Sequence, residues 1–222
     1  TTEAAALGFR SLGVTGGEPF LLPYLPDLLG SLAAVLPLIV LSNGTLFDGA
    51  RLARLARLGG LPLKIQLSLD RPDPITNDAL RGPDNFAKVV EAIPRLLDLG
   101  IGVRIATTLG DADPAELARL CHLHRELGVS DDDHVVRPIV RRGRAASNGM
   151  GVTAGSEELQ PELTITADGA FWSPFAPTVE AGRLDIDMLI TRTTSPLSVP
   201  ADAMLRVVEG RPRGDDSLAG IR

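Results

Sequence analysis

Residues 63–109 read LKIQLSLDRPDPITNDALRGPDNFAKVVEAIPRLLDLGIGVRIATTL, and this stretch decides the fold class. It opens with an apolar run at residues 63–69 and closes with another at residues 101–109, and both runs are typical of buried strands. Between them, apolar residues follow the i, i+3, i+4, i+7 spacing of a helix that ends at Gly100: Phe86, Val89, Val90, Ile93, Leu96 and Leu97. A strand, a helix and a second strand predict a unit with parallel strands.

The alternation of strand and helix continues on both sides of this stretch. Apolar runs at residues 9–15 and 38–42 precede it, and a run at residues 134–140 follows it. Helical patterns separate the runs, and the last helix is predicted to start at Asp113-Pro114, a capping acid with proline at the first helical position. Five strands alternating with four helices predict an α/β fold with a parallel sheet. The periodicity leaves open whether the sheet is open or curved into a partial barrel.

Composition and charge exclude several classes of protein. The 222 residues are 44% hydrophobic and 23% charged, which is ordinary for a globular protein and excludes a disordered chain. A net charge of −6 and an aromatic content of 4% argue against nucleic-acid binding. The most apolar region, residues 28–41, is interrupted by Gly30 and Pro37 and is shorter than the roughly 20 residues of a membrane helix. We therefore expect neither a nucleic-acid nor a membrane partner.

The sequence has one cysteine, Cys121. A disulfide framework and a site built from several cysteines of this chain are both excluded. The group Cys121-His122-x-His124 has the residue types of a metal motif, but Cys121 continues the apolar stripe of a predicted helix, and adjacent helical residues point about 100° apart. We interpret Cys121 as a core residue beside two solvated histidines and predict no metal ligand in this chain.

The chain is predicted to divide into a large and a small part. Residues 1–140 hold the alternating elements, and residues 141–161 lose periodicity, as a linker or mobile loop does. Residues 162–209 are predicted to form a C-terminal cap with a hairpin turn at Asp168-Gly169 and a helix, and residues 210–222 form a polar tail. No signal peptide is visible, and residues 3–8 read as the last turn of a helix. We expect a cytoplasmic protein with a further segment ahead of Thr1.

Polar residues follow every predicted strand, and the carboxyl ends of parallel strands meet at one edge of a sheet. The pair Gly16-Gly17 allows close approach of the backbone to a ligand. Glu18 and Asp70 are suited to an amine or to hydroxyl groups, and Arg81 to a carboxylate. Each of these strand ends alone is also explained by ordinary turn chemistry. Together they predict a small polar ligand at the carboxyl edge.

The segment Gly16-Gly17-Glu18-Pro19 resembles the GGEP motif of radical S-adenosylmethionine (radical SAM) enzymes. The order of three further segments also resembles that superfamily: LSNGTLF at residues 41–47, the stretch at residues 65–103, and VVRPIVRRGRA at residues 135–145. The resemblance covers about residues 4–145. It implies a partial (β/α) barrel of parallel strands that lacks its first strand, followed by a small cap of a hairpin and a helix.

The resemblance also implies roles for individual residues. Gly16, Gly17 and Glu18 fall on the positions that hold the methionyl amino group of SAM in the family. Ser68 and Asp70 fall where polar residues reach the ribose or the carboxylate, and Gln66 is a weaker candidate. Arg81 is our candidate for the cation that pairs with the SAM carboxylate. No catalytic residue is assigned.

The family cleaves SAM reductively to a 5′-deoxyadenosyl radical, which abstracts a hydrogen atom from a substrate. Its chemistry depends on a [4Fe–4S] cluster held by a C-x3-C-x2-C segment that this chain does not contain. Cys121 cannot replace three thiolates. We therefore expect the cluster ligands in an N-terminal segment and expect the present chain alone to be inactive. The electron donor implied by the family is a protein such as a flavodoxin or a ferredoxin.

Residues 162–177 resemble the start of the SPASM/twitch extensions of peptide-modifying radical SAM enzymes, but they contain no cysteine for an auxiliary cluster. The substrate is therefore open between a peptide and a small molecule. The alternative to an enzyme is a catalytically inactive scaffold that binds SAM or a peptide.

Overall fold

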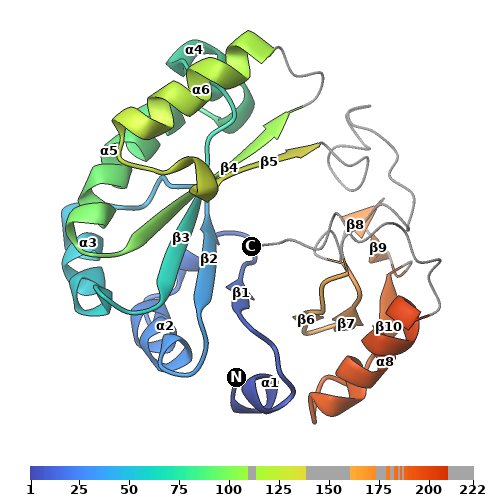
Figure 1. Cartoon of the computed structure of the whole chain (residues 1–222). Helices are drawn as coiled ribbons and strands as arrows, with labels where there is room; N and C mark the ends of the chain where they lie inside the picture. The colour runs from blue at the N-terminus through green and yellow to red at the C-terminus, as the bar shows by residue number, and fades with distance from the viewer. Residues whose placement is uncertain are drawn as a thin grey trace. The chain divides into compact units, whose positions relative to one another are not determined.

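Five strands form one parallel sheet in the order β1-β2-β3-β4-β5, which is also their order in the chain (Figure 1). The computed structural model describes residues 1–109, 114–138, 161–173, 179–180, 183–184, 186 and 188–209. The strands are β1 (Leu12–Val14), β2 (Leu38–Ser42), β3 (Leu63–Ser68), β4 (Gly102–Leu109) and β5 (His134–Pro138). The predicted α/β class with a parallel sheet is confirmed, and its strand order is that of a partial barrel.

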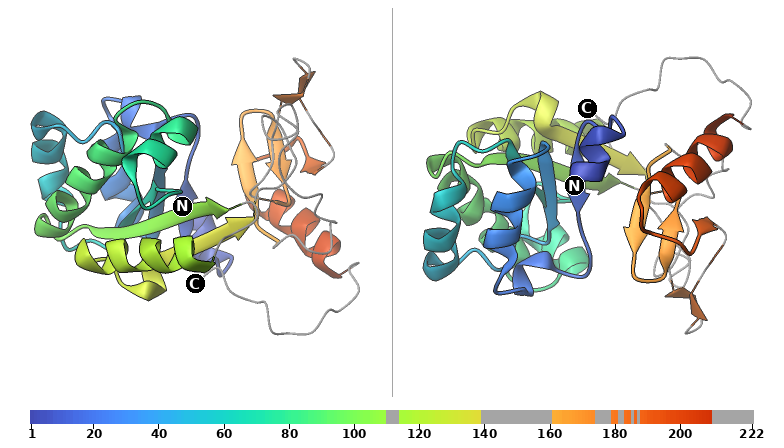
Figure 2. Two further views of the ribbon diagram at one scale, coloured as in Figure 1. Left: turned by 90° about the horizontal axis from the view of Figure 1, so that it is seen from above. Right: turned by 90° about the horizontal axis from the view of Figure 1, so that it is seen from below.

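Helices connect the strands and cover one face of the sheet (Figure 2). The α-helices are α1 (Thr2–Ala6), α2 (Leu25–Ala33), α3 (Gly49–Leu55), α4 (Pro74–Arg81), α5 (Asn85–Asp98) and α6 (Pro114–Glu126). Short 3₁₀ turns are η1 (Pro19–Leu21), η2 (Ala56–Leu58) and η3 (Asp131–Asp133). Among the described residues, no helix combines the length and the apolar character that a membrane crossing requires.

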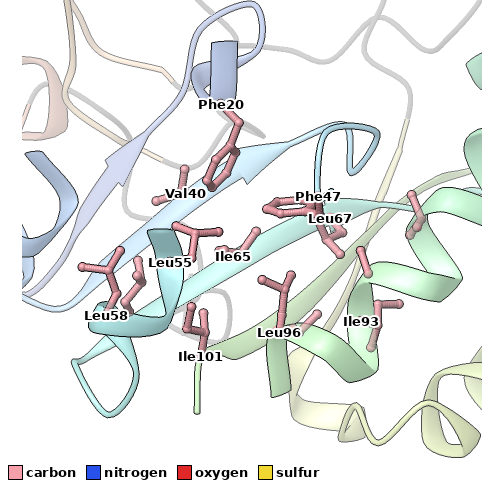
Figure 3. Packing of buried hydrophobic residues seen from close by; sticks show 14 of the residues in the cluster. Phe20, Val40, Phe47, Leu55, Leu58, Ile65, Leu67, Ile93, Leu96 and Ile101 are labelled. Atoms are coloured by element: carbon pink, nitrogen blue, oxygen red, sulfur yellow. The ribbon is translucent and has the colours of Figure 1, made fainter. Parts of the chain in front are cut away.

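The hydrophobic core lies between the helices and the outer face of the sheet, and Figure 3 shows part of it. Val40, Ile65 and Ile105 point to this face from three neighbouring strands and are fully buried. Ile93 and Leu96 of α5 meet them with the spacing of one helical stripe. Each such side chain contributes roughly 1.5–3 kcal/mol by leaving water. This burial fixes which side chains face outward, because residues alternate along a strand.

The opposite face of the sheet, which we call the inner face, carries polar and charged side chains. Strand pairing places Gln66 beside Arg104 and Thr108 beside Arg137. Ser68 lies on the same side as Gln66, two residues further along β3. Gln66 and Arg104 are each 5% exposed, so this polar layer is itself partly enclosed.

Two loops meet closely at the amino end of the sheet. The amide of Gly60, ahead of β3, donates to the carbonyl oxygen of Gly100, ahead of β4, at 3.0 Å. A Cβ added at Gly59 would lie 2.1 Å from the carbonyl oxygen of Leu99. This approach is possible because Gly59 has no side chain. It ties the start of β3 to the end of α5.

Two elements differ from the sequence-based prediction. The first strand is shorter than residues 9–15, because β1 comprises only Leu12–Val14. Helix α4 was not predicted at all. It begins with the Asp73 side chain, whose Oδ1 accepts from the amide of Thr76 at 3.0 Å, and with Pro74 at its first position. Hydrogen bonds from Thr76 lower the pKa of the exposed Asp73.

The chain divides into two compact units, Thr1–Pro138 and Ile139–Arg222. The second unit has its own core of Phe171, Trp172, Met188 and Met204. It contains β6 (Thr164–Thr166), β7 (Gly169–Phe171), β8 (Val179–Glu180), β9 (Arg183–Leu184), β10 (Leu189–Thr191) and α8 (Ser198–Glu209). The hairpin predicted around Asp168-Gly169 is confirmed as the antiparallel pair β6–β7, and the predicted helix is part of α8.

Several predicted segments fall on residues that the structure does not describe. The linker predicted at residues 141–161 lies outside the described residues except for Pro161. The tail at residues 210–222 and Asp113, the predicted cap of α6, also lie outside them.

Candidate ligand site at the carboxyl edge of the sheet

Gly16 and Gly17 follow β1 and expose their backbone at the carboxyl edge. A Cβ added at either glycine would meet no atom within 4 Å. The space above these peptide groups is therefore open to a ligand, and their N–H and C=O groups are reachable without a side chain in the way.

Glu18 binds the end of the neighbouring strand β2 through its carboxylate. Oε1 accepts from the amide of Phe20 at 3.1 Å and from the hydroxyl of Ser42 at 2.9 Å. Oε2 accepts from the amide of Asn43 at 2.7 Å. Charge-assisted hydrogen bonds of this kind hold the carboxylate in one orientation. The loop after β1 is thus anchored to the loop after β2.

Asp70 follows β3, and its side chain is 8% exposed. Its Oδ2 accepts from the Nε of Arg81 at 2.6 Å, and its Oδ1 accepts from the amide of Thr108 at 2.7 Å. Arg81 lies in the last turn of α4, and its two terminal amino groups make no hydrogen bond to any described residue. A carboxylate has about four acceptor positions, so Asp70 keeps acceptor capacity beyond these two bonds.

Ser68 and Gln66 are the other predicted ligand residues of β3. Among the described residues, neither side chain has a hydrogen-bond partner. Both lie on the inner face, with Arg104 on the adjacent strand β4 and Arg137 one strand further, on β5. Burial, and then the guanidinium of Arg137, lower the pKa of Arg104. Sequence analysis did not assign Arg104, although the alternation of Val103, Arg104 and Ile105 already indicates that Arg104 faces away from the core.

Three asparagines connect Glu18 with Asp70. The Asn43 carbonyl accepts from Asn85 Nδ2 at 3.1 Å, and Asn85 Oδ1 accepts from Asn77 Nδ2 at 3.0 Å. Asn77 Oδ1 accepts from the amide of Asp70 at 3.1 Å. Sequence analysis missed Asn77 and Asn85, because a lone asparagine in a helix gives no signal of what it contacts.

The structure thus brings together Asp70 and Arg81, which form an ion pair, and the asparagines link this pair to the backbone that holds Glu18. Ser68 lies on the inner face, and Gly16 and Gly17 lie at the end of β1. The roles that the resemblance gives to these residues stay predictions.

A buried histidine group lies on the helix-facing side of the sheet. His134 Nε2 lies 2.9 Å from Thr107 Oγ1, and its Nδ1 lies 3.6 Å from Cys121 Sγ. His124 is 1% exposed, stacks edge to face on His134, and has no partner for either ring nitrogen among the described residues. The expectation of two solvated histidines is therefore wrong for His124. It holds for His122, whose side chain is 73% exposed.

The described residues contain no group of three histidine, cysteine, aspartate or glutamate side chains that could hold a metal ion. The single thiol of Cys121 does not fit a [4Fe–4S] cluster, which needs several thiolates in one place.

The stability of the protein is expected to fall in acid because of His124. Burial, and then the neighbouring His134, lower the pKa of His124 from 6.5 to about 4. The unfolded chain therefore binds a proton that the folded chain does not bind between pH 6.5 and 4, and the free energy of unfolding decreases as the pH falls through this window. The total loss is roughly 3 kcal/mol for this one group. Burial also lowers the pKa of His134, which acts in the same direction.

Urea unfolding between pH 4.5 and 7.5 measures this dependence. His124→Phe is expected to flatten the pH dependence by about one proton, because it removes the titrating group and keeps an aromatic ring. The exposed His122→Gln is the matched control and is expected to leave the slope unchanged. An unaltered slope in His124→Phe contradicts the assignment.

Comparison with known proteins identifies the family of this chain. Residues 2–123 match the family model of the Radical SAM superfamily. A GTP 3′,8-cyclase of Microcystis aeruginosa (strain NIES-843 / IAM M-2473) is 33% identical over 125 residues, which cover 51% of this chain and 37% of the cyclase.

Two crystal structures of SuiB from Streptococcus suis share the fold, each with a TM-score of 0.50. SuiB itself is 20% identical over 57% of this chain and 29% of SuiB. SuiB bound to S-adenosylmethionine is 21% identical over 60% of this chain and 30% of SuiB. At these identities the likeness concerns the fold alone, and the chain spans about a third of each relative's length. The family match covers more than half of the sequence, and the chain therefore belongs to the radical SAM superfamily.

Proposed function

We propose that this chain binds SAM at the carboxyl edge of its sheet and is part of an enzyme that cleaves SAM reductively. The observation that carries the proposal is two anchored carboxylates at the carboxyl edge: Glu18 and Asp70 each accept from a backbone amide at 2.7 Å, and Glu18 directly follows the open backbone of Gly16 and Gly17. Family membership and the SAM-bound SuiB structure support the same ligand.

The methionyl end of SAM has an ammonium and a carboxylate group, so its site needs acceptors and donors close together. The carbonyl groups of Gly16 and Gly17 and the anchored carboxylate of Glu18 supply acceptors for the ammonium. Arg81 holds Asp70 through Nε, which leaves its terminal amino groups to bind the SAM carboxylate. Asp70 and Ser68 supply an acceptor and a hydroxyl for the ribose. In this proposal Arg104 and Arg137 add positive charge on the inner face.

The proposed overall reaction is a one-electron reduction of SAM. The bond between the sulfonium sulfur and C5′ breaks, which gives methionine and a 5′-deoxyadenosyl radical. The radical then takes a hydrogen atom from the substrate, which we leave open between a peptide and a small molecule. The electron would come from a flavodoxin or ferredoxin. Since one cysteine does not fit a [4Fe–4S] cluster, we derive no step through the cluster from these residues. A cytoplasmic location stays a prediction.

Titration calorimetry of the 222-residue chain with SAM tests the binding proposal. We expect saturable binding with one site per chain. Adenosine, which lacks the methionyl group, is expected to bind at least about tenfold more weakly, because it loses the charged contacts. The absence of saturable SAM binding, or equal affinity for the two ligands, overturns the proposal.

A second candidate is a catalytically inactive scaffold that binds SAM or a peptide, because the contacts proposed for Glu18 and Asp70 serve binding without any reaction. Translation of the coding sequence from further upstream distinguishes the two. An enzyme predicts three cysteines at the family spacing, an absorbing cluster after anaerobic reconstitution, and 5′-deoxyadenosine as a product. A longer protein that binds SAM but yields no 5′-deoxyadenosine supports the scaffold.

A further inference from the structure

Asn77 of α4 and Asn85 of α5 are buried polar side chains close to the loops at the carboxyl edge of the sheet. They are 0% and 2% exposed, and they join the loop after β2, at Asn43, to the loop after β3, at Asp70. A Ser, Thr, Asn or Asp side chain within a helix usually points to solvent or bonds the backbone of its own helix. These two bind each other and two loops instead.

The direction of each amide group is fixed by its neighbours. Asn77 Oδ1 faces the amide of Asp70, which can only donate, so Asn77 Nδ2 must face Asn85. Asn85 Nδ2 in turn faces the Asn43 carbonyl, which can only accept. Rotating either amide by 180° would place two donors or two acceptors together. The chain of hydrogen bonds therefore has a single polarity from Asp70 to Asn43.

Each end of this row of hydrogen bonds reaches one carboxylate of the candidate site. Asn43 donates its own amide to Glu18 at 2.7 Å, while Asp70 is held further by Thr108 and Arg81. A displacement of the peptide at Asn43 or Asp70 would therefore move a carboxylate as well as a hydrogen bond. Leaving one buried partner unsatisfied costs more free energy than a net hydrogen bond contributes, so the arrangement resists such a displacement.

We propose that Asn77 and Asn85 are positioning residues that hold Glu18 and Asp70 in the relative geometry required for SAM binding. This inference rests on the proposed function for its ligand, but the coupling itself belongs to the ligand-free chain. Neither asparagine reaches the carboxyl edge as a ligand, because both are enclosed beneath it.

Backbone amide hydrogen exchange of the full chain, followed by NMR without ligand, measures the coupling. In Asn85→Ala, the amides of Asn43 and Asp70 are expected to exchange at least about tenfold faster relative to the core amide of Ile65. The reason is that the loops at both ends of the asparagine hydrogen-bond network are then held less firmly. Asn85→Asp keeps the volume and the acceptor for Asn77 but loses the donor to Asn43. It is expected to speed exchange at Asn43 and leave Asp70 unchanged.

Two controls separate positioning from a general loss of stability. Glu91→Ala removes an exposed side chain of α5 that pairs with Arg95 one turn away, and it leaves every contact of the asparagines in place. Ile93→Ala makes a cavity in α5 at a fully buried site away from the asparagines. Neither control is expected to change exchange at Asn43 or Asp70 relative to Ile65.

SAM affinity supplies the second readout. Asn85→Ala and Asn85→Asp are expected to weaken SAM binding by about tenfold or more, and the two controls by less than about threefold. If the wild-type chain binds no SAM, the proposed function fails, while the exchange data still test the coupling. The inference is overturned if, in Asn85→Ala, exchange at Asn43 and Asp70 rises no more than exchange at Ile65. It is also overturned if Ile93→Ala weakens SAM binding as much as Asn85→Ala does.

Discussion

Glu18→Ala is expected to remove saturable SAM binding and to lower the free energy of unfolding by about 2–4 kcal/mol. The carboxylate accepts three hydrogen bonds, from Phe20, Ser42 and Asn43, and no described residue replaces it as their acceptor. Its loss frees the loop after β1 from the end of β2. The two effects have one cause, because the same carboxylate joins the loops and faces the proposed ammonium group.

Urea unfolding and SAM titration of the same preparation measure both effects. Glu91→Ala is the matched control, since Glu91 is exposed on α5 and forms an ion pair only with Arg95, one turn away. Such pairs contribute about 0.3–0.5 kcal/mol, so the control is expected to stay near the wild type in both measurements. Unchanged SAM affinity in Glu18→Ala would remove Glu18 from the site, whatever happens to stability.

Gly59→Ala is expected to lower the free energy of unfolding by about 3 kcal/mol, the largest loss expected for alanine at any glycine that the structure describes. The added Cβ would lie 2.1 Å from the carbonyl oxygen of Leu99, which is backbone and cannot rotate away. This clash is removed only when the loops ahead of β3 and β4 move apart, and that movement breaks the hydrogen bond from Gly60 to Gly100.

Thermal and urea unfolding compare this variant with Gly49→Ala. Gly49 is the first residue of α3, and a Cβ there meets nothing within 4 Å. Alanine favours the helix over glycine, so this control is expected to be neutral or slightly stabilising. Equal stability of the two variants would show that the contact between the two loops is looser than described here.

The sheet and its longest helix were predictable from periodicity. Runs such as residues 63–69 carry strong apolar signals because β3 is covered on its outer face, and α5 presents one continuous stripe to the core. Helix α4 was missed because only Asn77 among its residues is buried. The start of α4 could have been predicted, since Asp73-Pro74 has the same residue types as Asp113-Pro114, which predicted the start of α6.

The candidate ligand residues could be named from strand ends, but their partners could not. Arg81 was expected to face a ligand carboxylate, and in the structure its Nε binds Asp70, which lies eleven positions earlier. His124 was expected in solvent, and it stacks on His134 from another element. Such contacts depend on how strands and helices come together in space. A single sequence shows the residue types and not these distances.

The strand order described above also bears on how the protein is made. Leu12 pairs with Leu38, Leu38 with Leu63, and Lys64 with Gly102, so each strand meets the one that precedes it in the chain. Each strand of this sheet pairs with a strand that is its neighbour in the sequence, so only short loops have to close when the sheet forms. A ribosome releases the chain from its amino end. The sheet can therefore grow one strand at a time during synthesis, with each helix covering its strands as it emerges.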